Sequence, residues 1–204
     1  MADVVRFPTP VFRISFPALF KPESYDGGEP KFGCAAVWTP GNFSDKEKAL
    51  WSKIRKALDA ESTSVFGKKL NELPANIRRG LRDGAEKADM EGYGDGTKFA
   101  NLTTKMRPGL VDRFKKPIIL ESEKPQWDAE DKEYSSEDVY PGCYCRGTVT
   151  VYSYNNKGKG VALGLMNLQK VRDGERLDSR SDAAADFDDD FLEDDDDDTG
   201  FLDD

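Results

Sequence analysis

The stretch Cys143-Tyr-Cys-Arg-Gly-Thr-Val-Thr-Val-Tyr-Ser-Tyr154 decides the fold, because two kinds of side chain alternate along it. Cysteine, glycine and valine occupy the odd-numbered positions up to 151, whereas tyrosine, arginine and threonine occupy the even-numbered ones. This period of two is typical of a β-strand with one buried and one exposed face. The turn at 155–160 and the apolar run 161–166 predict a returning strand, so the two segments form a hairpin.

Three earlier segments predict further strands. Residues 11–16 place large apolar side chains, ending with Phe16, on one face, and we expect Pro17 to end this strand. Residues 31–39 predict its antiparallel partner, and residues 101–107 show the same alternation between polar and apolar side chains. Strands therefore lie both before and after the middle of the chain.

A helix is predicted between these strands. Ser44-Asp-Lys-Glu47 is a capping box, in which the serine and glutamate side chains satisfy backbone amides at a helix start. A second, shorter helix is expected over 75–81. The absence of strand and helix alternation favours a mainly β protein, a closed or partly open antiparallel barrel with an inserted helix. The apolar residues expected on the first helix are Ala49, Leu50, Ile54, Ala57 and Leu58.

Charge is distributed unevenly along the 204 residues. The chain holds 30 Lys+Arg and 39 Asp+Glu, a formal net charge of -9. Residues 181–204 contain twelve Asp, one Glu and no basic residue, which leaves 30 basic and 26 acidic groups, a net +4, in the first 180. We therefore expect a mildly basic folded domain, 1–180, and a disordered acidic tail, 181–204.

Several function classes are excluded by composition. The chain contains no histidine, which removes histidine-based triads and the commonest zinc ligand. The three cysteines are too few for a disulfide framework, and we expect reduced, buried thiols, with no metal, cofactor or catalytic residue. The enzyme alternative is a Mg²⁺-dependent nuclease built on carboxylates. Its candidate residues are Asp83, Asp95 and Asp112.

The polar face of the 143–154 strand suggests a binding surface. Exposed aromatic rings stack on unpaired bases, and neighbouring cations neutralise phosphates, so this mixture fits single-stranded nucleic acid. The alternative is that the tyrosines pack beneath a neighbouring segment, with their hydroxyls at the surface. The Gly-rich loop around Tyr93 is expected to be exposed, with that ring at its tip.

Aromatic residues interrupt the acidic tail. Phe187, Phe191 and Phe201 reduce solubility, so a tail that served only solubility would not need them. Such a segment fits a docking peptide that inserts a hydrophobic side chain into a basic-rimmed pocket, or a nucleic-acid mimic that occupies the domain's own groove.

An ordered set of segments within residues 11–177 resembles the bacteriophage single-stranded-DNA-binding proteins of the OB-fold type. The resemblance implies an OB-fold-like barrel, a DNA-binding sheet surface and an acidic tail with a near-terminal phenylalanine that recruits replication partners. The segments are 13–22, 31–40, 81–84, 105–109, 139–146 and 154–161.

Together these features predict sequence-nonspecific single-stranded DNA binding in phage replication and recombination, in the cytoplasm of an infected bacterial host. No apolar run approaches the roughly 18 residues of a membrane span, and the first residues do not form a signal peptide. Oligomers are compatible with the sequence, and an acidic DNA-mimic inhibitor is the non-enzymatic alternative. The expected phosphate contacts are Arg13, Arg82, Lys105, Arg107, Arg146 and Lys159, and the expected stacking rings are Tyr93, Tyr144, Tyr152 and Tyr154.

Overall fold

The computed structural model of the protein describes residues 5–24, 27–123, 133–156 and 158–178. The strands are β1 (Phe7–Pro8), β2 (Phe12–Glu23), β3 (Lys31–Trp38), β4 (Ile77–Arg78), β5 (Arg82–Asp83), β6 (Lys98–Thr104), β7 (Gly109–Val111), β8 (Tyr144–Asn156) and β9 (Gly158–Arg172). The helices are α1 (Asp45–Phe66) and the short 3-10 turns η1 (Pro40–Asn42), η2 (Leu70–Glu72), η3 (Gly84–Lys87) and η4 (Glu121–Glu123).

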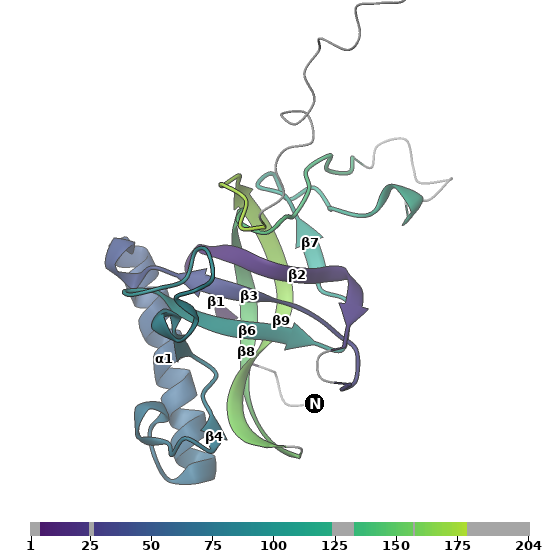
Figure 1. Cartoon of the computed structure of the whole chain (residues 1–204). Coiled ribbons are helices and arrows are strands. Elements are labelled where there is room, and N and C mark those ends of the chain that lie inside the picture. Colours follow the sequence, from purple (N-terminus) through teal and green to yellow (C-terminus); the bar gives the residue numbers. More distant parts are fainter. Residues whose placement is uncertain (1–4, 25–26, 124–132, 157, 179–204) are drawn as a thin grey trace, which may run out of the picture.

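Five strands close into a barrel (Figure 1). β2 pairs with β3, β3 with β6, β9 with β8, and β8 with β2, all antiparallel, while β6 and β9 pair in parallel. The distal part of the β8–β9 hairpin extends below the barrel in Figure 1. The expected mainly β, OB-fold-like barrel with an inserted helix is confirmed.

The β8 alternation is confirmed by burial. Cys143, Cys145 and Val149 point into the core, and the tyrosines between and beyond them do not. The three cysteines are free and buried, as expected, with the sulfur atoms of Cys143 and Cys145 3.6 Å apart. Burial raises the pKa of Cys34 to about 12, so this thiol stays protonated at neutral pH.

The first barrel strand differs from its expected form. Phe16 has a φ of 47° and is 51% exposed, because the register of β2 against β3 shifts between Ser15 and Ala18. This bulge turns the Phe16 side chain out of the core and lets the strand continue past Pro17. The predictions that Phe16 is buried and that Pro17 ends the strand are therefore wrong.

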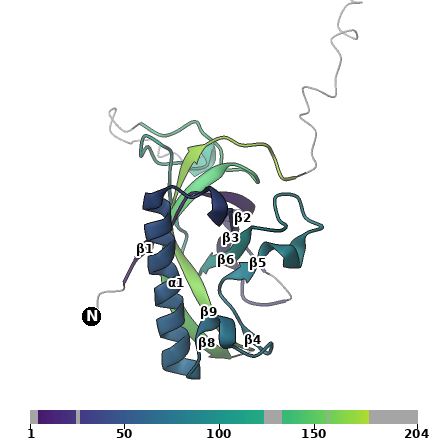
Figure 2. The ribbon, with the colours of Figure 1, turned by 90° about the vertical axis from the view of Figure 1, so that its left-hand side faces the viewer.

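Helix α1 begins as predicted and lies along one side of the barrel (Figure 2). Ser44 accepts a hydrogen bond from the Glu47 amide, and the Glu47 carboxylate accepts one from the Ser44 amide at 3.0 Å. The buried face of α1 is centred on Ile54 and Leu58 and also includes Trp51, which the expected apolar set omits, whereas Ala49 from that set is exposed. Trp51 packs 5.1 Å from Trp38 between ring centroids, which joins the helix to the barrel core.

Two other segments differ from the sequence prediction. The helix expected over 75–81 is absent, because Ile77 and Arg78 form β4 and pair in parallel with Lys159 and Gly160 of β9. The strand expected over 101–107 is shifted, with β6 ending at Thr104. None of the helices among the described residues is long and apolar enough to span a membrane.

Candidate nucleic-acid interface

The outer face of the β8–β9 hairpin carries two adjacent tyrosines. Tyr152 is 37% exposed, and its ring centroid lies 6.4 Å from that of Tyr154. The Tyr154 ring lies over Gly160, where any Cβ would come 2.7 Å from the phenol oxygen. Burial raises the Tyr154 pKa, and the positive charge of Arg78 on β4 opposes that shift. These rings are held on paired strands, so they form a rigid surface.

Residues without bulky side chains continue this surface across the barrel. Gly164 on β9 pairs with Thr103 on β6, which in turn pairs with Gly33 on β3. A Cβ on Gly164 would lie 3.4 Å from the Tyr152 ring, on the same outer face. The neighbouring Leu163 points the other way and is fully buried. The same Cβ on Gly164 would lie 2.7 Å from the Thr150 hydroxyl oxygen, so Thr150 and Tyr152 together cover the backbone at Gly164 and form the surface that a base would meet.

A second group of aromatic rings surrounds the ammonium group of Lys87, next to the start of β6. The Lys87 Nζ atom lies 5.5 Å from the ring centroid of Phe16, 5.3 Å from that of Tyr93 and 5.2 Å from that of Phe99. The Arg82 guanidinium lies 4.8 Å from the Phe99 ring. We call these five residues the aromatic cage. Burial, followed by the Arg82 charge, lowers the Lys87 pKa.

The cage changes the interpretation of the Gly-rich loop. The Tyr93 ring is half-buried and packs edge-on against Phe99 at 5.4 Å, so it is not at an exposed loop tip as the sequence suggested. Burial raises the Tyr93 pKa. Phe16 is the ring of the cage with the largest exposure, and its left-handed backbone conformation is costly for an aromatic residue. Strain of this kind is concentrated at functional sites in proteins.

The cage and the tyrosine pair belong to one continuous face. Phe99, Asn101 and Thr103 alternate along β6 with the core residues Ala100 and Leu102 and span roughly 13 Å. Asn101 is exposed, whereas Phe99 is fully buried in contact with the Tyr93 ring. Thr103 leads across to Gly164 and Tyr152. In OB-folds the face of the second and third barrel strands binds oligonucleotides, and here those strands are β3 and β6.

Tyr144 lies elsewhere and is enclosed. The Arg172 guanidinium lies 3.4 Å from its ring centroid and that of Arg13 lies 6.0 Å away. Arg13 also donates a 2.7 Å hydrogen bond to the Glu175 carbonyl, and a Cβ on Gly174 would come 2.8 Å from the ring. The chain after β9 therefore covers this tyrosine, as in the packing alternative raised from the sequence.

The remaining predicted cations are separated from one another and several have partners. Lys105 pairs with Glu29 at 2.7 Å, and the two guanidinium NH₂ groups of Arg107 pair with Glu123. Arg146 donates a 2.7 Å hydrogen bond to the Gln169 amide oxygen. These contacts are solvent-accessible and contribute little to stability, so phosphates would compete with them. Lys159 is exposed at the start of β9, where it pairs with Asn155, the residue after Tyr154 on β8.

The carboxylates considered for a nuclease do not meet. Asp83 caps η3 and pairs with Lys98, Asp112 accepts amide hydrogen bonds from Phe114 and Lys116, and Asp95 is exposed in the Gly-rich loop. Within the described ranges no three Cys, Asp or Glu side chains are placed to hold a metal ion. The tail residues Phe187, Phe191 and Phe201 lie outside the described residues.

Sequence reasoning missed Phe16 and Lys87. The alternation of β2 predicts that Phe16 lies in the core, and no neighbouring residue indicates a bulge. Lys87 lies close to charged residues in a Gly-rich segment, and this composition predicts a solvent-exposed loop. The usable signal was the combination of Gly92, Gly94 and Gly96, whose positive φ angles fold the loop back onto the sheet.

Two comparisons of the sequence match known proteins. The model of the family described as "Enterobacter phage Enc34, ssDNA-binding protein" matches residues 6–200. Protein p50 of Acyrthosiphon pisum secondary endosymbiont phage 1 is 30% identical over 166 residues, which are 80% of this chain and 81% of that protein.

Two solved structures share the fold. The bacteriophage Enc34 single-stranded DNA-binding protein in complex with ssDNA aligns with a TM-score of 0.64 and 21% identity, covering 84% of this chain and 89% of that one. The single-stranded DNA binding protein gp2.5 of bacteriophage T7 aligns with a TM-score of 0.52 and 14% identity, covering 98% and 100%.

Proposed function

This chain belongs to the family of the Enterobacter phage Enc34 single-stranded-DNA-binding protein, and on that premise we propose that it binds single-stranded DNA without reading its sequence. The observation that carries the proposal is the continuous outer face from the aromatic cage to Tyr152 and Tyr154. Ring stacking accepts any base, because every base has a π-face, and the cations along the face neutralise the backbone.

We assign different contributions to the two ends of this face. Tyr152 and Tyr154 are stacking platforms, since their rings are adjacent and partly exposed. The Phe16 ring of the cage adds a third platform beside the Lys87 ammonium, which supplies a charge for a phosphate. Lys105, Arg107, Arg146 and Lys159 provide further phosphate contacts where the strand reaches them, and the enclosed pair Arg13 and Tyr144 contributes less.

A salt titration tests this proposal. We expect oligo(dT) to bind with a log–log dependence of affinity on salt whose slope is about −0.7 for each phosphate neutralised. Fluorescence anisotropy of a labelled oligonucleotide at several salt concentrations measures the slope. Failure to bind oligo(dT) at low salt would refute the proposed function.

We propose that the protein acts in phage DNA replication and recombination, in the cytoplasm of the bacterial host. In this proposal residues 1–180 bind DNA, while the acidic tail 181–204 recruits replication proteins and competes with DNA. Support comes from the tail's thirteen carboxylates and three phenylalanines, a composition suited to docking on a basic-rimmed apolar pocket.

Removing residues 181–204 is expected to tighten oligo(dT) binding at low salt. A tethered segment has an effective concentration on the order of millimolar, so the tail's carboxylates compete with DNA phosphates for the same cations. The difference should vanish at high salt, where both contacts are screened. The matched control replaces Phe187, Phe191 and Phe201 with alanine, which retains the carboxylates and should leave DNA affinity unchanged. Equal affinities of full-length and shortened chains at low salt would contradict self-competition.

A further inference from the structure

A groove next to the barrel face lies between α1 and the segment that leads into β6. It has a volume of about 540 Å³ and is lined by residues of α1, η2, β5, η3 and the start of β6. Figure 2 shows the β4–β5 segment running beside the helix. Trp51, Leu70 and Leu81 contribute to its apolar lining, and its charged lining consists of five cations and the carboxylates of Asp59, Asp83 and Glu86. These cations are Arg55, Lys69, Arg79, Arg82 and Lys98.

Three of the five cations are available for a ligand. Within the described part of the chain, Arg55, Lys69 and Arg79 form no ion pair, whereas Arg82 pairs with Glu86 and Lys98 with Asp83. One guanidinium nitrogen of Arg79 donates a 2.7 Å hydrogen bond to the Leu73 carbonyl, which holds the group in place and leaves its other N–H groups to bind. The paired cations are in solvent-exposed pairs, which an anion displaces at little cost.

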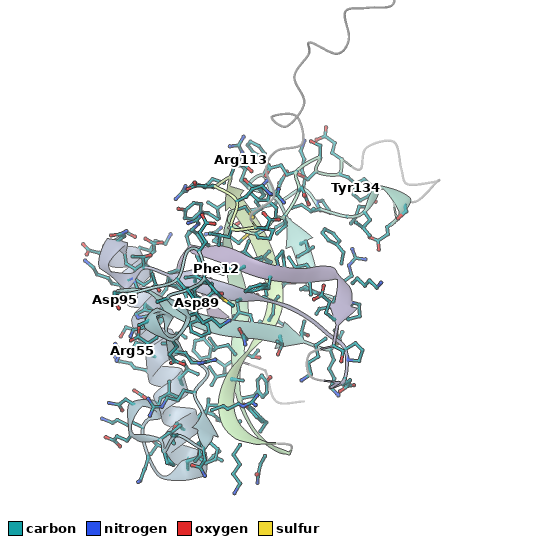
Figure 3. All side chains as sticks on the ribbon, viewed as in Figure 1. Phe12, Arg55, Asp89, Asp95, Arg113 and Tyr134 are labelled. Atoms are coloured by element: carbon teal, nitrogen blue, oxygen red, sulfur yellow. The ribbon has the colours of Figure 1, made fainter. Side chains whose placement is uncertain are left out.

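The groove is continuous with the proposed DNA face. Arg82 lines the groove and also lies over Phe99 of the aromatic cage. Lys98, which lines the groove as well, is the β6 residue next to Phe99. A strand that leaves the cage on the groove side therefore meets the ion pairs Arg82–Glu86 and Lys98–Asp83, whose carboxylates also line the groove. Arg55, which is labelled in Figure 3, lines the groove from α1.

We infer that this groove carries the sugar-phosphate backbone of the same DNA strand beyond the stacking face, with Arg55, Lys69 and Arg79 as phosphate contacts. The inference rests on the proposed function. It adds a second segment to the binding site, in which phosphates are held by charge and no base needs to stack. The protein's site therefore extends from the barrel onto the exposed basic side of α1.

The test compares charge reversals on full-length protein with oligonucleotides of two lengths. Arg55→Glu with Lys69→Glu changes two exposed groove residues that form no side-chain hydrogen bond among the described residues. Lys53→Glu with Lys68→Glu is the matched control, because both lysines are exposed nearby but do not line the groove. The probes are labelled oligo(dT) of about 6 and about 20 nucleotides, which span the range of site sizes of an OB-fold.

The groove variant should bind the longer oligonucleotide about tenfold more weakly, and its salt slope should be smaller in magnitude by about 1.4, the loss of two phosphate contacts. The groove variant should bind the shorter oligonucleotide as the wild type does, and the control variant should bind both oligonucleotides as the wild type does.

Equal losses of affinity in both variants, or no loss in the groove variant, would overturn the inference and leave the barrel-face proposal intact. Tighter binding by the groove variant would overturn it too, because it would mean that the groove holds the acidic tail. If the wild-type protein bound neither oligonucleotide, both proposals would be refuted.

Discussion

Replacing Tyr152 and Tyr154 with alanine is expected to produce the largest loss of DNA affinity. Each stacked base contributes about 1–3 kcal/mol, so removing one ring should raise Kd roughly 5- to 150-fold, and removing both should raise it further. Neither ring belongs to the core cluster, so the melting temperature should change little. Anisotropy titration with oligo(dT) and thermal unfolding measure the two quantities separately.

The matched control is Tyr152→Phe with Tyr154→Phe. It keeps both rings and removes only the hydroxyls, so it should bind oligo(dT) nearly as well as the wild type. If the phenylalanine variant lost as much affinity as the alanine variant, the hydroxyls would be the contact and stacking would be wrong. If the alanine variant bound normally but melted much lower, the tyrosines would be packing residues.

Leu163→Ala is expected to have the largest effect on stability. Leu163 is fully buried and pairs with Leu102 where β6 and β9 close the barrel in parallel. Truncating a buried leucine costs about 2–5 kcal/mol, because the surrounding core relaxes only partly into the cavity. Urea unfolding should show this loss as a lower midpoint with little change in slope.

This variant also separates the two faces of β9. Leu163 points into the core and Gly164 lies on the outer face beside Tyr152, so the folded fraction of Leu163→Ala should bind oligo(dT) with almost wild-type affinity at low temperature. A stability loss below about 1 kcal/mol would place Leu163 outside the well-packed core, since buried Leu→Ala changes cost more. The β9 strand would then be oriented differently from the structure described above.

The features predicted correctly from sequence are governed by local rules. The alternation of β8 requires only that one face be buried, and the capping box at Ser44 requires only four neighbouring residues. Both signals identify an element from its own side chains. The hairpin of β8 and β9 follows from its turn in the same way.

The features that escaped prediction depend on residues distant in sequence. The β2 bulge at Phe16 is a property of pairing with β3, and the 75–81 segment becomes strand β4 because it meets β9 about eighty residues later. Tyr144 reads like Tyr152 and Tyr154 in the sequence, but the chain after β9 folds over it. Strand alternation identifies a surface side chain and gives no information about a later segment that covers it.

The most direct test of base stacking on the barrel face compares oligo(dT) with an oligonucleotide of equal length whose nucleotides are abasic. Both carry the same phosphates, so electrostatic binding and its salt slope should be the same for the two probes. We predict that the wild-type protein binds oligo(dT) at least about tenfold more tightly, since stacking contributes about 1–3 kcal/mol per base. The preference should be much smaller in the Tyr152→Ala, Tyr154→Ala variant, which keeps only the Phe16 platform. Equal affinity of the wild-type protein for the two probes would contradict the account, because binding would then rest on phosphates alone.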